Sequence, residues 1–154
     1  DARILPIYEG TNAIQANDFM FRKTIRDNGK AAKELLDEIK IDCDDNFEMS
    51  QMVTLTSKSL DYILENRDDQ EMLSCISFDY LMGFGYLVGG WLMDKAKRSA
   101  KEQLSKTSIN EIFLKSKIVS AEFYDFHILP RIDYHLKVVM KGAKVVQTAN
   151  DSFI

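Results

Sequence analysis

The 154-residue sequence has little of what marks turn-rich, disulfide-bonded or membrane-spanning proteins. Its two prolines and seven glycines favour long uninterrupted helices over a β fold built on many tight turns. Its two cysteines have no CxxC spacing, so we expect two free thiols and a cytoplasmic protein. No apolar stretch reaches the roughly 20 residues of a membrane helix, because the longest, 78–93, is interrupted by Asp79. We therefore expect no membrane span.

The sequence also lacks a basic excess and a metal-ligand pattern. Its formal net charge is -4, whereas nucleic-acid binders usually present a basic face, so nucleic acid is not an expected partner. His127 and His135 lie eight residues apart, unlike the i, i+4 pair of a zinc-binding helix. In the acidic segment that starts at Asp42, Phe47 and Val53 stand where a calcium loop needs Gly and Glu. We expect no metal site and a solvated acidic linker over 42–46.

What the sequence does contain is helical periodicity. Apolar residues recur at spacings of three and four, and short polar or helix-breaking segments separate the runs. The expected helices cover about 12–26 with a continuation to Ile39, then 49–63, 69–104, a segment that ends before Pro130, and 132–146. Amphipathic helices joined by short connections bury their apolar faces best against one another. The sequence predicts an all-α fold, an antiparallel four-helix-type bundle preceded by one further helix.

The same spacing predicts which side chains face the core. In the long helix we expect the inward residues Leu81, Val88 and Leu92, and in the next helix Ile112, Val119, Phe123 and Phe126. Gly85 and Gly89 lie four residues apart and predict a close helix contact. A basic run follows in the long helix, made of Lys95, Lys97, Arg98 and Lys101. It is either a solvated helix face or a site for a phosphate group or a partner.

Glu9 is the candidate catalytic side chain of this sequence. It lies in the run Tyr8-Glu9-Gly10-Thr11, in a glycine-containing turn directly before a predicted helix. A carboxylate abstracts a carbon-bound proton when it is positioned against that carbon and when desolvation raises its pKa. The helix that follows directs free N–H groups toward an anion such as a cofactor phosphate. From the spacing alone, a Glu that is exposed at the start of a helix is commoner than a buried catalytic base.

The active-site segment of the acyl-CoA dehydrogenases resembles Ala2-Arg3-Ile4-x-x-Ile7-Tyr8-Glu9-Gly10-Thr11-Asn12-x-Ile14-Gln15. In that family the Glu of the YEGT motif removes the α-proton of an acyl-CoA thioester while the β-hydrogen leaves as hydride to FAD. The resemblance implies that Glu9 is this base and that Gly10 lies near the substrate. It also implies that the FAD is lined by Thr11, Asn12 and Ala13.

The remainder of the chain is similar to an extra C-terminal helical domain that a subset of these enzymes carries. The similar residues are Tyr80-Leu81-Met82-Gly83-Phe84-Gly85, Gly90-Trp91 and Lys117-x-x-x-Ala121-x-Phe123-Tyr124-x-x-x-Ile128-Leu129-Pro130. We expect residues 1–27 to form the end of the dehydrogenase core, including its last helix, and residues 28–154 to form the appended domain. Because the family's other FAD contacts lie outside this sequence, we expect the chain alone to be inactive and to hold no FAD tightly.

The resemblance implies a parent flavoprotein that binds an acyl-CoA substrate, passes electrons to a partner protein and forms a homo-oligomer. The alternative is a role without catalysis. In that case residues 28–154 act as a helical interaction or dimerisation module.

Overall fold

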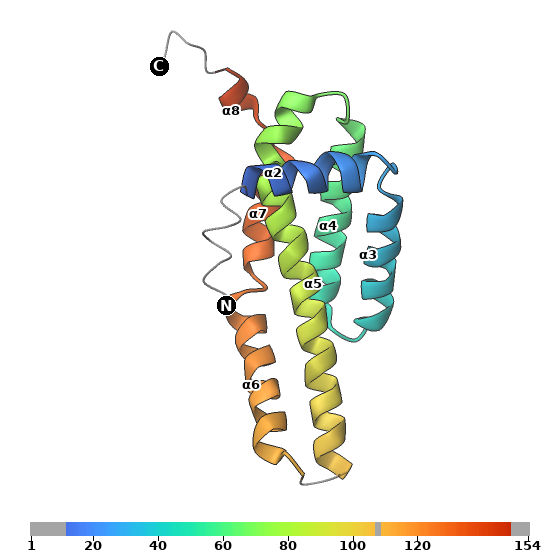
Figure 1. The fold of residues 1–154 in the computed structure, drawn as a ribbon, viewed down its shortest axis with the longest axis vertical. Coiled ribbons are helices and arrows are strands. Elements are labelled where there is room, and N and C mark those ends of the chain that lie inside the picture. Colours follow the sequence, from blue (N-terminus) through green and yellow to red (C-terminus); the bar gives the residue numbers. More distant parts are fainter. Residues whose placement is uncertain (1–11, 107–108, 149–154) are drawn as a thin grey trace.

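The computed structural model of the protein describes residues 12–106 and 109–148 (Figure 1). Its elements are α2 (Asn12–Asn17), the π-helix η1 (Asp18–Ile25), α3 (Lys30–Asp42), α4 (Phe47–Glu65), α5 (Gln70–Lys106), α6 (Glu111–His127), α7 (Arg131–Lys141) and α8 (Lys144–Gln147). Within those two described ranges there is no β-strand. The all-α prediction is therefore confirmed.

The helices form a bundle around α5, which runs the full length of the molecule (Figure 1). α3, α4 and α5 follow one another as antiparallel neighbours, with α3 on the outer side of α4. α6 and α7 then run back along α5, one after the other, and together serve as the fourth member of the bundle. α2 and η1 cross α5 near one end. This is the predicted antiparallel four-helix arrangement preceded by a helix.

The breaks between helices follow local sequence signals. α4 begins where the side chain of Asn46 accepts a hydrogen bond from the backbone N–H of Met49 at 3.2 Å. After η1, Asn28 and Gly29 adopt φ values of 57° and 74°, the left-handed conformation in which helices commonly end. Pro130 separates α6 from α7, as predicted, because proline cannot continue the preceding helix. Helix boundaries are thus set by residues close to them in sequence.

The first helix differs in type from the prediction. The expected α-helix over 12–26 is α-helical only to Asn17 and continues as a π-helix from Asp18. The wider turn is seen in the backbone, where the N–H of Arg26 donates to the carbonyl of Phe21, five residues earlier, at 3.1 Å. The periodicity of apolar residues located the helix, but it did not reveal the change of pitch.

α5 supplies the centre of the core. Its large buried side chains are Met72, Leu73, Ile76, Tyr80, Phe84, Leu87 and Trp91. Tyr80, Leu87 and Trp91 each directly precede a residue that was predicted to face inward. They belong to one core with the buried apolar residues of α4 and α7, which are Met49, Val53, Leu60, Ile63, Ile132, Leu136 and Val139. The predicted inward set was right only in part, because Val88 is half-buried and packs against the core, Leu81 is half-buried, and Leu92 is 54% exposed. α5 is apolar on most sides, so its periodicity does not select one face.

α6 also presents to the core a face other than the predicted one. Leu114 and Ala121 are buried against α5. The residues expected to be inward are exposed, by 87% for Ile112, 63% for Val119, 58% for Phe123 and 81% for Phe126. α6 therefore carries two apolar faces, and the prediction chose the one that α5 does not cover.

Glycines allow neighbouring helices to approach α5 closely. A Cβ added to Gly83 would lie 2.6 Å from Cδ2 of Leu136, and one added to Gly90 would lie 2.7 Å from Cδ1 of Leu129. Of the predicted pair, only Gly89 makes such a contact, with the Tyr124 hydroxyl, whereas Gly85 faces open space. The close contacts therefore involve Gly83, Gly89 and Gly90, so the prediction is confirmed for Gly89 and was wrong for Gly85.

α5 has 37 residues and passes a test of length and apolar composition for a membrane-crossing helix. In the bundle, 44% of its apolar window is buried, and the helix lies against α4, α6 and α7. The central helix of a bundle needs apolar residues on several sides for this packing. Packing on these helices therefore accounts for the buried part of the apolar window.

Candidate functional site

The described part of the chain contains two of the five residues predicted to form a site. Asn12 and Ala13 are the first two residues of α2, and both are exposed. Glu9, Gly10 and Thr11 lie outside the described residues. The candidate base and its immediate neighbours therefore stay predictions from the sequence.

The helix that follows the predicted site is fixed to the bundle by η1. Met20 and Thr24 are buried, and the Phe19 ring lies 5.2 Å from the ring of Tyr80 on α5. The hydroxyl of Thr24 donates to the Tyr80 oxygen at 3.5 Å. Burial raises the pKa of Tyr80 to about 12, so its phenol stays neutral. These contacts give the chain after Asn12 one position relative to α5.

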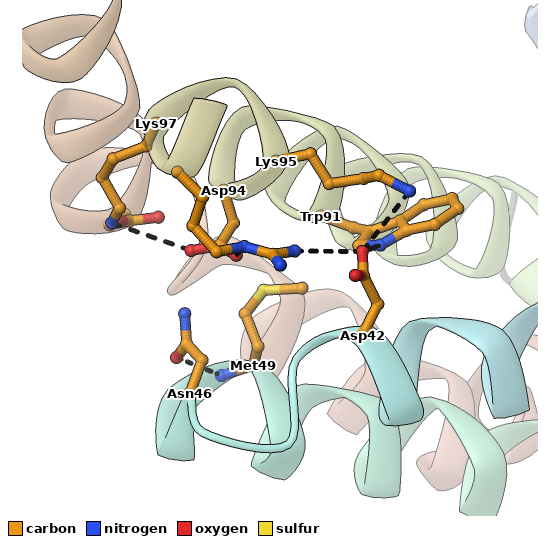
Figure 2. A network of polar contacts seen from close by, with 9 residues as sticks. Asp42, Asn46, Met49, Trp91, Asp94, Lys95 and Lys97 are labelled. Carbon is orange, nitrogen blue, oxygen red and sulfur yellow. Dashed lines mark hydrogen bonds and ion pairs between the residues drawn. The ribbon is translucent and has the colours of Figure 1, made fainter. Parts of the chain in front are cut away.

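A network of charged side chains joins the end of α3 to α5 (Figure 2). Asp42 accepts a hydrogen bond from the indole N–H of Trp91 at 2.6 Å and pairs with Arg98 at 3.0 Å. Lys95 lies 3.4 Å from the same carboxylate. Arg98 also donates to Asp94, which is only 5% exposed, at 2.9 Å. The buried carboxylate of Asp94 is thus compensated by a neighbouring cation.

The same network continues from α5 to α6 through Lys97. Its ammonium donates to Asp125 at 2.7 Å and lies 3.9 Å from Asp94. Burial alone would lower the pKa of Lys97, but the hydrogen bond and charge of Asp125 raise it above its usual value. For Asp42, the hydrogen bond from Trp91 is the main cause that holds the pKa below its usual value, and Arg98 adds to it. Cations and carboxylates therefore stabilise one another across three helices.

The basic run of α5 was interpreted from the sequence as a solvated face or as a site for a phosphate or a partner. Three of its residues fit neither interpretation, because each forms an ion pair with a carboxylate of this chain. These residues are Lys95, Lys97 and Arg98. Asp42 is the last residue of α3 and not part of a solvated linker. Sequence reasoning missed its role because no local signal relates it to Trp91, which lies 49 residues away.

The remaining titratable side chains of interest are dispersed. His135 lies with Nδ1 2.7 Å from Asp79 and joins α7 to α5. Cys43 is buried and Cys75 exposed, and both are free thiols, as predicted. Burial raises the pKa of Cys43 to about 11, with the charge of Asp94 adding to this effect. Among the described residues, no three His, Cys, Asp or Glu side chains gather closely enough to hold a metal ion.

Two surface grooves lie away from the start of α2. One of about 430 Å³ is formed where α4 meets the junction of α6 and α7, and its apolar lining is Met52, Phe126, Leu129 and Pro130. Another of about 430 Å³ lies beside the α3–α4 connection and includes Phe47, Asp94 and Arg98. Neither groove is lined by Asn12 or Ala13.

Comparison with known proteins places this arrangement in a family. A family model described as "Acetyl-CoA dehydrogenase C-terminal like" matches residues 28–149. The chain is 33% identical to a 3-methylmercaptopropionyl-CoA dehydrogenase of Ruegeria pomeroyi, over 84% of this chain and 24% of that protein. It is 30% identical to a broad-specificity linear acyl-CoA dehydrogenase of Mycobacterium tuberculosis, over 90% of this chain and 26% of that protein.

A third relative, a butyryl-CoA dehydrogenase of Syntrophomonas wolfei, is 27% identical over 90% of this chain and 25% of its own length. The chain thus spans about a quarter of the length of the curated relatives it matches. The family model covers most of the chain, and the helical fold and the relatives agree with it. The chain belongs to the acetyl-CoA dehydrogenase C-terminal-like family, within the acyl-CoA dehydrogenases.

Proposed function

We propose that this chain is the C-terminal part of an FAD-dependent enzyme that catalyses α,β-dehydrogenation of an acyl-CoA thioester. The observation that carries the proposal is the Tyr8-Glu9-Gly10-Thr11 motif, which lies shortly before the family match at 28–149. On this proposal, residues 1–27 end the dehydrogenase core and residues 28–154 form the appended helical domain. Relatives named acyl-CoA dehydrogenases, each about four times as long as the match, support it.

In the proposed enzyme Glu9 removes the α-proton of the thioester. A carboxylate does so when the substrate holds the carbon against it and when apolar surroundings raise its pKa. Gly10 has no side chain and lets the substrate approach the backbone closely. Thr11, Asn12 and Ala13 contribute to one side of the FAD site at the start of α2, where Asn12 and Ala13 are exposed. FAD, when bound, supplies the hydride acceptor.

The parent enzyme would be a cytoplasmic flavoprotein of fatty-acid metabolism that acts as a homo-oligomer with an electron-transfer partner. The described residues supply only the helix that follows the motif and the bundle on which it packs. We therefore expect the isolated 154-residue chain to hold no FAD tightly and to oxidise no acyl-CoA.

The base is tested in the longer enzyme that carries this segment. Glu9→Gln preserves size and removes the charge, and we expect turnover of acyl-CoA with an artificial electron acceptor to fall about 10²- to 10⁴-fold at unchanged FAD content. Glu38→Gln makes the same change on an exposed position of α3 and should leave turnover unchanged. Full turnover of the Glu9→Gln enzyme would refute the assignment of the base. An isolated chain that binds FAD and oxidises an acyl-CoA would refute its expected inactivity.

One observation favours a second function, a helical interaction or dimerisation module without catalysis. It is the exposed apolar face of α6, which the fold leaves outside the core. Proteins that work as monomers rarely expose extended apolar faces, because association or aggregation follows. If a polar substitution on this face abolished the association of the chain with a partner or a second copy while the fold stayed intact, that result would support the interaction role.

A further inference from the structure

The exposed face of α6 has the spacing of a coiled-coil helix. Positions 112, 116, 119, 123 and 126 alternate by four and three residues, as the core positions of heptads do. Four of the five are apolar and are 58–87% exposed, and the fifth is Ser116. We call Ile112, Ser116, Val119, Phe123 and Phe126 the α6 stripe. The opposite face of the same helix, with Leu114 and Ala121, already packs on α5.

The area of the stripe matches one side of a small protein–protein interface. Its four apolar residues are 58–87% exposed, and with side chains of this size they expose about 500–600 Å². This is the upper end of the roughly 300–600 Å² of the largest apolar patch of a typical monomer, a patch that is often functional. Weak or transient interfaces bury less than about 600 Å² from each partner.

The spacing of the stripe also indicates the shape of its partner. A heptad seam on a straight helix is complementary to a second helix with the same seam, because side chains of one fill the gaps of the other. Two antiparallel copies of α6 can be aligned so that Ile112 packs on Phe123 of the second copy and Ser116 on Val119. Each layer occurs twice, as a twofold axis requires.

Charge supports the antiparallel alignment. In that register Lys115 of one copy lies beside Glu122 of the other, and the pair occurs twice. Both side chains are exposed at the edge of the stripe, and Lys115 is held there by Glu111 at 2.5 Å. A parallel alignment would place Lys115 near Ser120 and Glu122 near His127, with no carboxylate–ammonium pair. The flanking charges therefore favour the antiparallel pair.

The surroundings of the stripe leave room for a second helix. α6 lies at the side of the bundle, and its N-terminal half extends with α5 beyond α3 and α4 (Figure 1). At its other end the stripe opens into the groove lined by Met52, Phe126 and Leu129. The antiparallel register brings the first turn of the second copy's α6 toward this groove.

We propose that the α6 stripe pairs with the same stripe of a second copy of this chain, as an antiparallel twofold helix pair. The inference names the partner for the interaction role proposed above and rests on that role. The dehydrogenase proposal does not depend on it, because Glu9 lies outside this interface.

Sedimentation equilibrium of the 154-residue chain tests the pair, at concentrations up to about 100 µM, where a pair with a dissociation constant of a few micromolar is mostly dimeric. We expect a dimer, and a folded monomer for Phe123→Lys, because the substituted side chain is exposed in the single chain. Far-UV circular dichroism verifies that the variant is folded. A wild-type chain that stays monomeric, or a folded Phe123→Lys variant that dimerises like wild type, would overturn the proposal.

Charge exchange tests the register. Lys115→Glu or Glu122→Lys alone places like charges together twice and should weaken dimerisation about tenfold, whereas the double variant should restore it. A mixture of the two single variants should form heterodimers in preference to either homodimer. The matched controls are Lys58→Glu and Glu38→Lys, exposed residues of α4 and α3, which should dimerise like wild type.

If the single and double variants dimerise equally, the antiparallel register is wrong. None of these outcomes affects the dehydrogenase proposal, which depends on the turnover of the Glu9→Gln enzyme. The failure of one proposal is therefore distinguishable from the failure of the other.

Discussion

Replacing Trp91 by Phe removes one hydrogen bond from the charged network between α3 and α5 and keeps most of the buried ring. In the wild type the indole N–H donates to Asp42 at 2.6 Å (Figure 2). A hydrogen bond to a charged group contributes about 1.5–3 kcal/mol to stability. Because 26% of the Asp42 side chain is exposed, water replaces part of the lost bond, and we take the lower value of about 1.5 kcal/mol.

The smaller ring adds a second, apolar loss. Trp91 is 8% exposed, so nearly all of the area removed with the second ring is buried, which is worth roughly 1 kcal/mol. The free energy of unfolding should therefore fall by about 2–3 kcal/mol at neutral pH. Urea denaturation followed by far-UV circular dichroism measures it, since Trp91 is the only Trp and its fluorescence is lost in the variant.

The pH dependence separates the hydrogen bond from the packing. The Trp91 hydrogen bond is the main cause that lowers the pKa of Asp42 below 3.8, its usual value. A carboxyl with a lowered pKa stabilises the fold above its unfolded-state pKa and loses that contribution as the pH falls through its folded-state pKa. The difference in the free energy of unfolding between wild type and Trp91→Phe should therefore be largest at neutral pH and become smaller below about pH 4.

A double-mutant cycle with Asp42→Ala tests the same interaction. The two substitutions should be non-additive by about 1 kcal/mol, because each removes the same hydrogen bond. The role assigned to the Trp91–Asp42 contact would be refuted by two results together. The two substitutions would change the free energy of unfolding additively, and the difference in that free energy between wild type and Trp91→Phe would be the same at neutral and acid pH.

Two further predictions concern α5 and the cysteines. Gly83→Ala should lower the free energy of unfolding by about 1–3 kcal/mol, because its Cβ would lie 2.6 Å from Cδ2 of Leu136. Gly85→Ala, with open space around the added Cβ, should instead raise it by about 0.5–1 kcal/mol, and equal effects in urea denaturation would contradict this packing. A thiol reagent should label Cys75 rapidly and Cys43 slowly, since Cys43 is buried with a pKa of about 11, and equal rates would contradict its burial.

Much of the fold was predictable because its signals are local. Asn46 caps α4, Asn28 and Gly29 follow η1, and Pro130 separates α6 from α7. Each acts through its own backbone conformation or through a hydrogen bond to a residue nearby in sequence. The helix expected over 49–63 is confirmed as part of α4, which has one apolar face. The helix expected over 132–146 was wrong at its end, because α7 stops at Lys141 before Gly142, whose φ is 65°, and Val146 in α8 is 60% exposed.

The inward faces of α5 and α6 were not predictable in the same way. α5 is apolar on most sides, and α6 has two apolar faces of similar spacing. The spacing of apolar residues indicates which faces of a helix are apolar, but which of them is buried depends on where the neighbouring helix packs. For the candidate site, the sequence provided Glu9 and its motif, whereas the described structure contributes only the placement of Asn12 and Ala13.

The sequence by itself determined that the chain is helical, where most of its helices lie, and the family resemblance, since these depend on residues that are neighbours along the chain. Only the tertiary structure decided that α5 faces the core with Trp91 and not Leu92. It also decided that Asp42 compensates Arg98 and that the α6 stripe points outward. The physical reason is that burial and ion pairing depend on which distant segments meet, and in a bundle with more apolar faces than neighbours one face stays exposed.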